Sequence, residues 1–250
     1  MPTGLPADLL LPPPPARWPD AALFLDLDGV LAPLAPRPDD VGPQARRTAV
    51  LQALEARLDG RLAIISGRTI DEIDRISGGG VRAVSGVHGL ERRDARGFTY
   101  RAQAAPGVRT ALDAFRAFAA TRPGVIVEDK GVSAGLHYRQ APDHAAEAAR
   151  LAARLAEAAG LTLQPGHMVL ELRTPGADKG SALAAFMAEA PFMGATPVMV
   201  GDDLTDEYAF RAAEALGGFG GLVGPPRETA ARHGLADVPA VLDWLEAVAA

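Results

Sequence analysis

Short apolar runs alternate with longer amphipathic segments over much of the chain. The first run, residues 21–25, is too short for a stable helix and ends at Asp26. Such a run is typical of a strand buried on both faces of a parallel sheet. Similar runs predict strands at 61–67, 81–86, 197–201 and 221–223. The segments between them predict helices at 43–58, 70–76, 179–189, 207–216 and 239–248. This strand and helix alternation predicts an α/β fold with a Rossmann-like parallel sheet and right-handed crossovers.

The middle of the chain breaks this alternation. A helix at 107–121 precedes two short strands, 125–130 and 133–139, which can pair as a hairpin near Gly131; a helix at 143–159 and strands at 161–164 and 168–173 repeat that order. The repeat predicts an inserted α+β cap of two α-β-β units at 106–176, within a core formed by 20–105 and 177–250. Residues 1–19 contain four consecutive prolines and predict an extended or disordered lead-in. A cleft between core and cap would be a natural substrate site.

Composition excludes several classes of function. The chain has 250 residues, a net charge of −6 and no basic block, which argues against nucleic acid as a partner. It has no cysteine, so disulfides, thiolate metal sites and cysteine nucleophiles are excluded. No apolar run approaches membrane-spanning length and the N-terminus lacks a secretory pattern, so we expect a cytoplasmic protein with no membrane partner. The sequence is also compatible with a monomer.

Polar residues follow the predicted core strands. Asp26 and Asp28 come directly after the first strand, and side chains two apart on an extended segment point to the same side. In open α/β sheets, ligands bind beyond the carboxyl ends of the strands. The other polar residues expected near this edge are Ser66, Gly67, Arg68, Lys179, Asp202, Asp203 and Asp206. The set fits phosphomonoester hydrolysis, which needs a nucleophile, an acid for the leaving oxygen and positive groups on the phosphoryl oxygens. Its carboxylates suit Mg²⁺, which prefers oxygen ligands.

Each of these residues also has a structural interpretation. Aspartates are common in turns, and Ser66 could simply cap the end of a strand. Asp203 and Asp206 could cap the following helix. Lys179 is one of only two lysines among 25 basic residues, and at the first turn of a helix it is disfavoured by the macrodipole, so it needs an anionic partner.

The motifs resemble those of a known superfamily. DLDGVLAP, SGR, the Lys179 segment and GDDLTDE occur in the order of the four motifs of haloacid-dehalogenase (HAD) phosphatases, over about residues 20–230. Within that superfamily, VEDKGVSAGLHYR, GHMVLELRTPGADKG and VGDDLTDEYAF are similar to the trehalose-6-phosphate phosphatases. The resemblance implies a HAD core with a cap, and Mg²⁺-dependent hydrolysis of trehalose 6-phosphate, a small-molecule sugar phosphate.

The resemblance also implies a role for each motif residue. Asp26 would attack phosphorus and carry an aspartyl-phosphate, while Asp28 would protonate the leaving sugar oxygen and then deprotonate water. Ser66 and the Gly67 amide would hold one phosphoryl oxygen, and Lys179 would neutralise another. The implied metal site consists of Asp26, the backbone carbonyl of Asp28 and Asp202, with Asp203 and Asp206 beside them.

The cap would determine the substrate specificity. The family's sugar-binding positions match Glu128, Lys130 and Glu171 in the cap, with Arg68 and His88 from the core. Carboxylates paired with cations can both accept from and donate to sugar hydroxyls. The alternative is a set of cross-strand ion pairs on a solvated sheet face, and for His88 a role in holding its loop. The remaining histidines show no metal-ligand spacing and are assigned to structure: His137, His144, His167 and His233.

Two alternative functions stay open at this point. The same chemistry could act on another sugar phosphate, such as sucrose 6-phosphate or mannosyl-3-phosphoglycerate. A catalytically silent sugar-phosphate-binding module is the alternative from another class, although it predicts loss of a catalytic aspartate, and both Asp26 and Asp28 are present.

Overall fold

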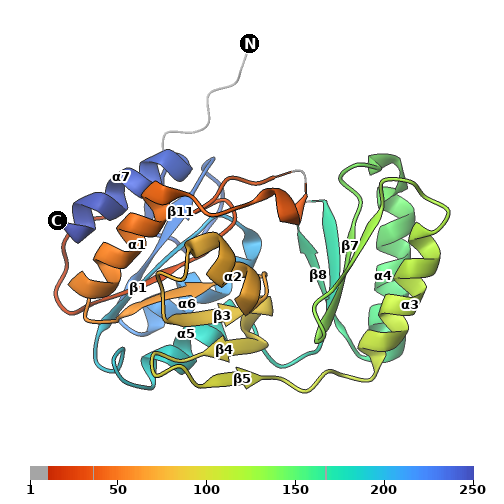
Figure 1. Cartoon of the computed structure of the whole chain (residues 1–250), viewed down its shortest axis with the longest axis horizontal. Coiled ribbons are helices and arrows are strands. Elements are labelled where there is room, and N and C mark those ends of the chain that lie inside the picture. The colour runs from red at the N-terminus through yellow and green to blue at the C-terminus, as the bar shows by residue number, and fades with distance from the viewer. Residues whose placement is uncertain (1–10, 36, 167) are drawn as a thin grey trace, which may run out of the picture. The chain divides into compact units, whose positions relative to one another are not determined.

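The computed structural model describes residues 11–35, 37–166 and 168–250, and the chain divides into two compact units (Figure 1). The first unit is formed by the described residues up to Tyr100 together with Ala177–Ala250. The second unit is Arg101–Gly176, five residues longer at its start than the insertion expected from sequence. Every helix in the described part of the chain is too short or too polar to cross a lipid bilayer.

The first unit is built on one mixed sheet. Within the described residues it has eight strands in the order β12-β11-β10-β1-β2-β3-β4-β5. Their bounds are β12 His233–Leu235, β11 Phe219–Val223, β10 Thr196–Gly201, β1 Ala21–Leu25, β2 Leu62–Ile65, β3 Ala83–Gly86, β4 Glu91–Arg93 and β5 Thr99–Arg101. The six strands from β12 to β3 pair in parallel, so the predicted parallel α/β core is confirmed.

Helices cover both faces of this sheet. The residues of β1 alternate between the two faces: Leu23 and Leu25 pack in one apolar cluster, and Ala22 and Phe24 in the other. The first cluster includes residues of α1 (Ala45–Arg57), α2 (Ile70–Ser77) and α7 (Val238–Ala249), and the second includes residues of α5 (Lys179–Met187) and α6 (Glu207–Ala215). Burial on both faces explains why β1 is an uninterrupted apolar run.

The sequence prediction missed three short strands at or next to the two edges of the sheet. β4, β5 and β12 were not predicted, and β4 pairs antiparallel with β3, so the sheet is not purely parallel. These strands have only three residues each, and β4 reads Glu-Arg-Arg. A strand of three residues is too short to show apolar alternation, and β4 has a charged residue at every position.

The second unit is a four-stranded antiparallel sheet with two helices, within the described residues. Its strands lie in the order β6 (Ile126–Asp129), β7 (Ser133–His137), β9 (Val169–Arg173) and β8 (Thr162–Gly166). Helices α3 (Gly107–Ala119) and α4 (Ala145–Ala159) lie side by side against one face (Figure 1). The expected hairpin of β6 and β7 is confirmed, as is the order of two α-β-β segments.

Four short 3₁₀ turns connect these elements in the described residues: η2 (Pro38–Asp40), η3 (Val87–Gly89), η4 (Pro142–His144) and η5 (Leu204–Asp206). The described part of the lead-in, residues 11–19, contains no helix or strand, and residues 1–10 lie outside the description. It is bonded to the core, because Pro12 and Pro15 accept hydrogen bonds from Gly234 and from the Trp244 indole.

Candidate active site

A buried lysine joins two carboxylates at the carboxyl end of β1. Lys179 Nζ lies 2.6 Å from Asp26 Oδ2 and 2.7 Å from Asp206 Oδ1. Lys179 is the first residue of α5, whose N-cap Asp178 accepts a hydrogen bond from the Ser181 amide. All three bridged residues are buried, with Lys179 only 2% exposed. A lysine in the first turn of a helix needs an anionic partner, and Lys179 has two, Asp26 and Asp206.

Asp206 shapes the loop that follows β10. Its Oδ2 accepts hydrogen bonds from the backbone amides of Asp202 and Asp203, each at 3.0 Å. A Cβ placed on Gly201 would lie 2.3 Å from the Asp206 carboxyl carbon, so only glycine leaves room for this carboxylate. Asp203 is the N-cap of η5 and accepts from the Leu204 amide at 2.7 Å. The structural interpretation weighed above for Asp203 thus matches its geometry.

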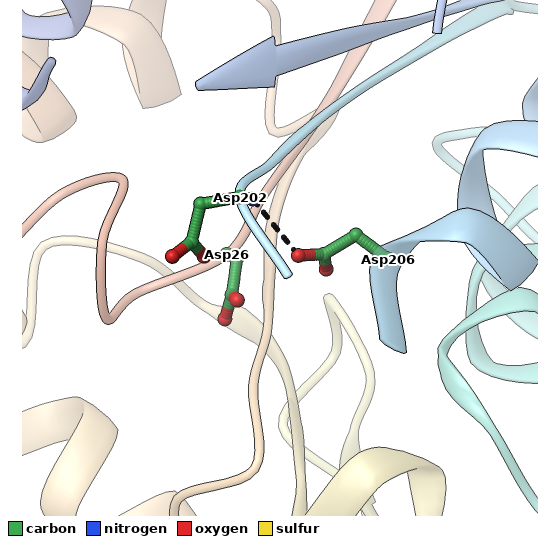
Figure 2. A group of neighbouring side chains, drawn as sticks. All are labelled: Asp26, Asp202 and Asp206. Carbon is green, nitrogen blue, oxygen red and sulfur yellow. Dashed lines mark hydrogen bonds between the residues drawn. The ribbon is translucent and has the colours of Figure 1, made fainter. Parts of the chain in front are cut away.

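Asp26, Asp202 and Asp206 form an acidic group (Figure 2). Each offers one carboxylate oxygen, and the three oxygens lie within 4.8 Å of one another. Asp206 is fully buried and accepts three hydrogen bonds, whereas Asp26 accepts two, from the Leu27 amide and from Lys179. Asp206 is therefore the least available of the three carboxylates for a metal ion. At Gly29, φ is +75° and an added Cβ would lie 2.0 Å from Asp202 Oδ2, so a glycine is needed for this approach.

The electrostatics of this group favour a bound cation. Burial and the negative charge of Asp206 raise the pKa of Asp202 from 3.8 to about 7. Burial raises the pKa of Asp26 well above its ordinary value, although Lys179 opposes that shift. Burial acts to lower the pKa of Lys179, but the charges of Asp206 and Asp26 raise it overall. One lysine charge faces three carboxylates, so the donor set fits a divalent cation that takes oxygen ligands.

Asp28 is held by an arginine fork. Arg68 Nε and Nη2 donate to the two oxygens of Asp28 at 2.7 and 2.9 Å, and its Nη1 donates to Glu72 at 3.1 Å. The sugar contact expected for Arg68 stays a prediction, and the structure adds the contacts of its guanidinium with Asp28 and with Glu72 of α2. Glu72 in turn completes the capping box of α2 with Thr69. This geometry makes Arg68 a support for the carboxylate of Asp28.

Ser66, Gly67 and His88 lie together beyond the ends of β2 and β3. Ser66 is buried, its Oγ accepts from the Arg68 amide at 3.3 Å, and its carbonyl accepts from the His88 amide at 3.0 Å. His88 has a φ of 53°, and a Cβ on Gly67 would lie 2.6 Å from its Nε2. The imidazole therefore packs against Gly67, where a side chain would displace it.

The three cap residues predicted to bind sugar also lie together, within the second unit. Lys130 Nζ lies 3.0 Å from Glu171 Oε2 and 3.5 Å from Glu128 Oε2, although Lys130 itself lies past the end of β6. His137 Nε2 lies 2.8 Å from the same Glu128 oxygen. His137 was assigned to structure from sequence, because no metal-ligand spacing marks it. Only the register of β6 against β7 could have shown its approach to Glu128.

Sequence reasoning also missed Arg227. Its Nη2 donates to the backbone carbonyls of Asp203 at 3.0 Å and of Asp202 at 3.4 Å, and its Nη1 pairs with Glu207. Glu207 also accepts from the Ala230 amide at 2.8 Å. These contacts connect the loop after β10, which contains Asp202 and Asp203, to the segment between β11 and β12. No motif surrounds Arg227, so nothing in the sequence indicated it.

Comparison with known proteins places this geometry in context. Residues 24–232 match the family model described as trehalose-phosphatase. A protein of Escherichia coli (strain K12) named trehalose-6-phosphate phosphatase is 42% identical over 229 residues, 91% of this chain and 86% of that one. A solved structure titled trehalose-6-phosphate phosphatase related protein gives a TM-score of 0.73 at 27% identity, covering 90% of this chain and 95% of that one. A haloacid dehalogenase-like hydrolase from Bacteroides thetaiotaomicron, at 16% identity, shares the fold with a TM-score of 0.64 over 90% of this chain and 97% of its own.

Proposed function

The chain belongs to the trehalose-phosphatase family, and from this premise we propose that it hydrolyses trehalose 6-phosphate to trehalose and phosphate through an aspartyl-phosphate on Asp26. The observation that carries the mechanism is the buried contact of Asp26 with Lys179 at 2.6 Å, beside Asp202 and Asp206. A lysine at this distance balances the charge of a carboxylate nucleophile and lies beside the phosphoryl group that the carboxylate attacks.

In the first step, a carboxylate oxygen of Asp26 forms a bond to phosphorus, and the bond from phosphorus to the sugar oxygen breaks. The leaving oxygen takes a proton from the carboxyl group of Asp28. Lys179 donates to a phosphoryl oxygen, and Ser66 with the Gly67 amide binds another. Asp28 becomes a carboxylate when it gives up this proton, and the Arg68 fork stabilises that form on both oxygens.

In the second step, Asp28 takes a proton from a water molecule, whose oxygen attacks phosphorus. The bond from phosphorus to Asp26 breaks, phosphate leaves, and Asp26 is again a carboxylate. The same Asp28 therefore acts first as an acid and then as a base, and ends protonated for the next cycle.

Mg²⁺ is the cofactor we propose. Asp26, Asp202 and the backbone carbonyl of Asp28 would hold it, with Asp206 supporting the loop and Asp203 beside it as the N-cap of η5. When bound, the ion supplies positive charge that reduces repulsion between the nucleophile and the phosphate.

Glu128, Lys130 and Glu171 of the cap would recognise the sugar through its hydroxyl groups. The sugar contacts of Arg68 and His88 stay predictions from the sequence. Sucrose 6-phosphate and mannosyl-3-phosphoglycerate are the competing substrates. The cytoplasmic location and the monomeric state stay predictions from the sequence.

Phosphate release with Mg²⁺ tests the proposal on these three substrates. Trehalose 6-phosphate should give the highest kcat/KM, and Asp26→Asn should abolish turnover. Asp59→Asn is the matched control, because it removes a carboxylate that is 81% exposed in the same unit. Preference for another substrate would refute the assigned specificity. Binding of trehalose 6-phosphate without turnover would favour the non-catalytic binding module.

A further inference from the structure

The polar face of the cap sheet contains a row of residues that lie in register across three strands. Gly135 of β7 pairs with Glu128 of β6 on one side and with Glu171 of β9 on the other. Two carboxylates therefore flank a position that has no side chain. A Cβ on Gly135 would lie 3.2 Å from Glu128 Oε2 and 3.5 Å from His137 Nε2, so these two groups meet over the glycine.

Successive residues of β7 lie on opposite faces of the cap sheet. Ala134 and Leu136 belong to the apolar cluster that packs against α3 and α4. Because side chains alternate along a strand, Ser133, Gly135 and His137 lie on the opposite face. That face holds the charged groups named above. A histidine at the end of this strand thus faces the predicted sugar-binding residues and not the helices.

Each carboxylate of the row is held by a partner on β7 in addition to Lys130. Ser133 Oγ donates to Glu171 Oε1 at 2.6 Å. His137 lies 2.8 Å from Glu128 Oε2, and since an ionised carboxylate can only accept, the imidazole Nε2–H donates. Lys130 lies near both carboxylates, at 3.0 Å from Glu171 and 3.5 Å from Glu128.

We propose that His137 is a positioning residue for sugar recognition, because its Nε2–H holds Oε2 of Glu128 and turns Oε1 toward a substrate hydroxyl. This inference rests on the proposed function, in which Glu128 binds the sugar. Without the imidazole, Lys130 would be the charged partner left to Glu128 among the described residues, and it would draw the carboxylate toward Glu171. The spacing of the two acceptors, which selects a sugar by its hydroxyl pattern, would then be lost.

The charges around Glu128 agree with this geometry. Burial acts to raise the pKa of Glu128, but the hydrogen bond from His137 and the charge of Lys130 hold it below its ordinary value, against the repulsion of Glu171. Glu128 is therefore ionised at neutral pH. Hydrogen bonds to ionised groups are stronger than those between neutral groups, so the loss of one should be measurable.

Steady-state kinetics of two variants test the role of His137. His137→Leu removes the donor, whereas His137→Gln keeps an N–H donor at a similar distance from the backbone. His144→Leu is the matched control, since His144 is a cap histidine 3.6 Å from an exposed carboxylate, Glu147. Each protein is assayed with trehalose 6-phosphate and with p-nitrophenyl phosphate, which has no sugar for the cap to bind.

His137→Leu should raise KM for trehalose 6-phosphate about tenfold, equivalent to about 1.4 kcal/mol, with little change in kcat. His137→Gln should restore most of the affinity, and kcat/KM for p-nitrophenyl phosphate should not change in either variant. The inference is overturned if KM of His137→Leu stays within about twofold of wild type. It is equally overturned if both variants lose activity on both substrates, since that pattern indicates a role in folding.

The proposed function can fail separately from this inference. If the wild-type chain does not hydrolyse trehalose 6-phosphate, the proposed function is wrong. Calorimetric titration with trehalose then decides the inference: weaker binding to His137→Leu than to wild type supports the positioning role, and equal or undetectable binding to both contradicts it.

Discussion

Replacing Lys179 with methionine removes the cation that lies between two buried carboxylates. Methionine matches the length and apolar stem of lysine, so the change is mainly one of charge. Asp26 and Asp206 would lose contacts of 2.6 and 2.7 Å, and Asp202 lies in the same group. Three carboxylates would then face one another with no positive charge from Lys179.

The magnitude follows from the burial of this group. Removing one partner of a buried ion pair typically costs about 3–5 kcal/mol, because the remaining charge is left uncompensated. A small domain has only about 5–15 kcal/mol of unfolding free energy, so the loss should be large but need not prevent folding. Removal of one group that stabilises developing negative charge should lower kcat by about 10²–10³-fold.

Urea denaturation and phosphate release measure these two effects. Arg116→Met is the matched control, because Arg116 pairs with Asp129 at the surface, with side chains 51% and 46% exposed, where a pair is worth about 0–1 kcal/mol. A second variant, Lys179→Met with Asp206→Asn, removes one negative charge and keeps an acceptor for the Asp202 and Asp203 amides. It should recover part of the lost stability.

The pH dependence of stability tests the same balance of charges. Carboxyl groups with raised pKa values bind protons in the folded state before they do so in the unfolded state, so a lower pH stabilises a folded protein that contains them. The decrease in unfolding free energy caused by Lys179→Met should therefore be smaller at about pH 5.5 than at about pH 8. A decrease in unfolding free energy below about 1 kcal/mol, or an equal decrease at both pH values, would refute the view that Lys179 balances these charges.

Three other changes test neighbouring parts of the site. Arg68→Lys keeps the charge but not the fork on Asp28, so kcat should fall about tenfold, and an unchanged kcat would contradict a supporting role for Arg68. Gly29→Ala should displace the Asp202 carboxylate and raise the Mg²⁺ concentration for half-maximal activity at least about tenfold, measured by titration of activity with the metal. Since the pKa of Asp202 is raised from 3.8 to about 7, its contribution to metal-free stability should fall as pH rises across that interval. Adding Mg²⁺ after EDTA treatment should therefore raise Tm more at about pH 8 than at about pH 5, and an equal shift would count against Asp202 as a ligand.

Much of the core could be predicted from local pattern. β1 is apolar on both faces because two layers of helices cover it, so the run at 21–25 and the acid that ends it were visible in sequence. A sheet then brings the ends of its strands together, which made the meeting of Asp26 with Asp202 and Asp206 predictable. The spacing of these acids along the chain alone does not contain that information.

The partners of the site residues could not be predicted in the same way. Lys179 was predicted to neutralise a phosphoryl oxygen, which stays a prediction, and its ion pairs with Asp26 and Asp206 were not foreseen. The ion pair of Arg68 with Asp28 was not foreseen either, and the sugar contact predicted for Arg68 stays a prediction. Which carboxylate a lysine or arginine pairs with depends on the distance between side chains of separate elements, and these long side chains can reach several carboxylates. The contact of His137 with Glu128 depends in the same way on the register of a hairpin.

Chemical trapping of the phosphorylated chain shows whether Asp26 is the nucleophile. The wild-type enzyme is mixed with trehalose 6-phosphate and Mg²⁺, quenched in acid within one turnover, digested and examined by mass spectrometry. One phosphoryl group should be found on Asp26, released by hydroxylamine as expected of an acyl phosphate. Phosphorylation of another residue, or complete turnover with no phosphorylated peptide at any quench time, would contradict the account.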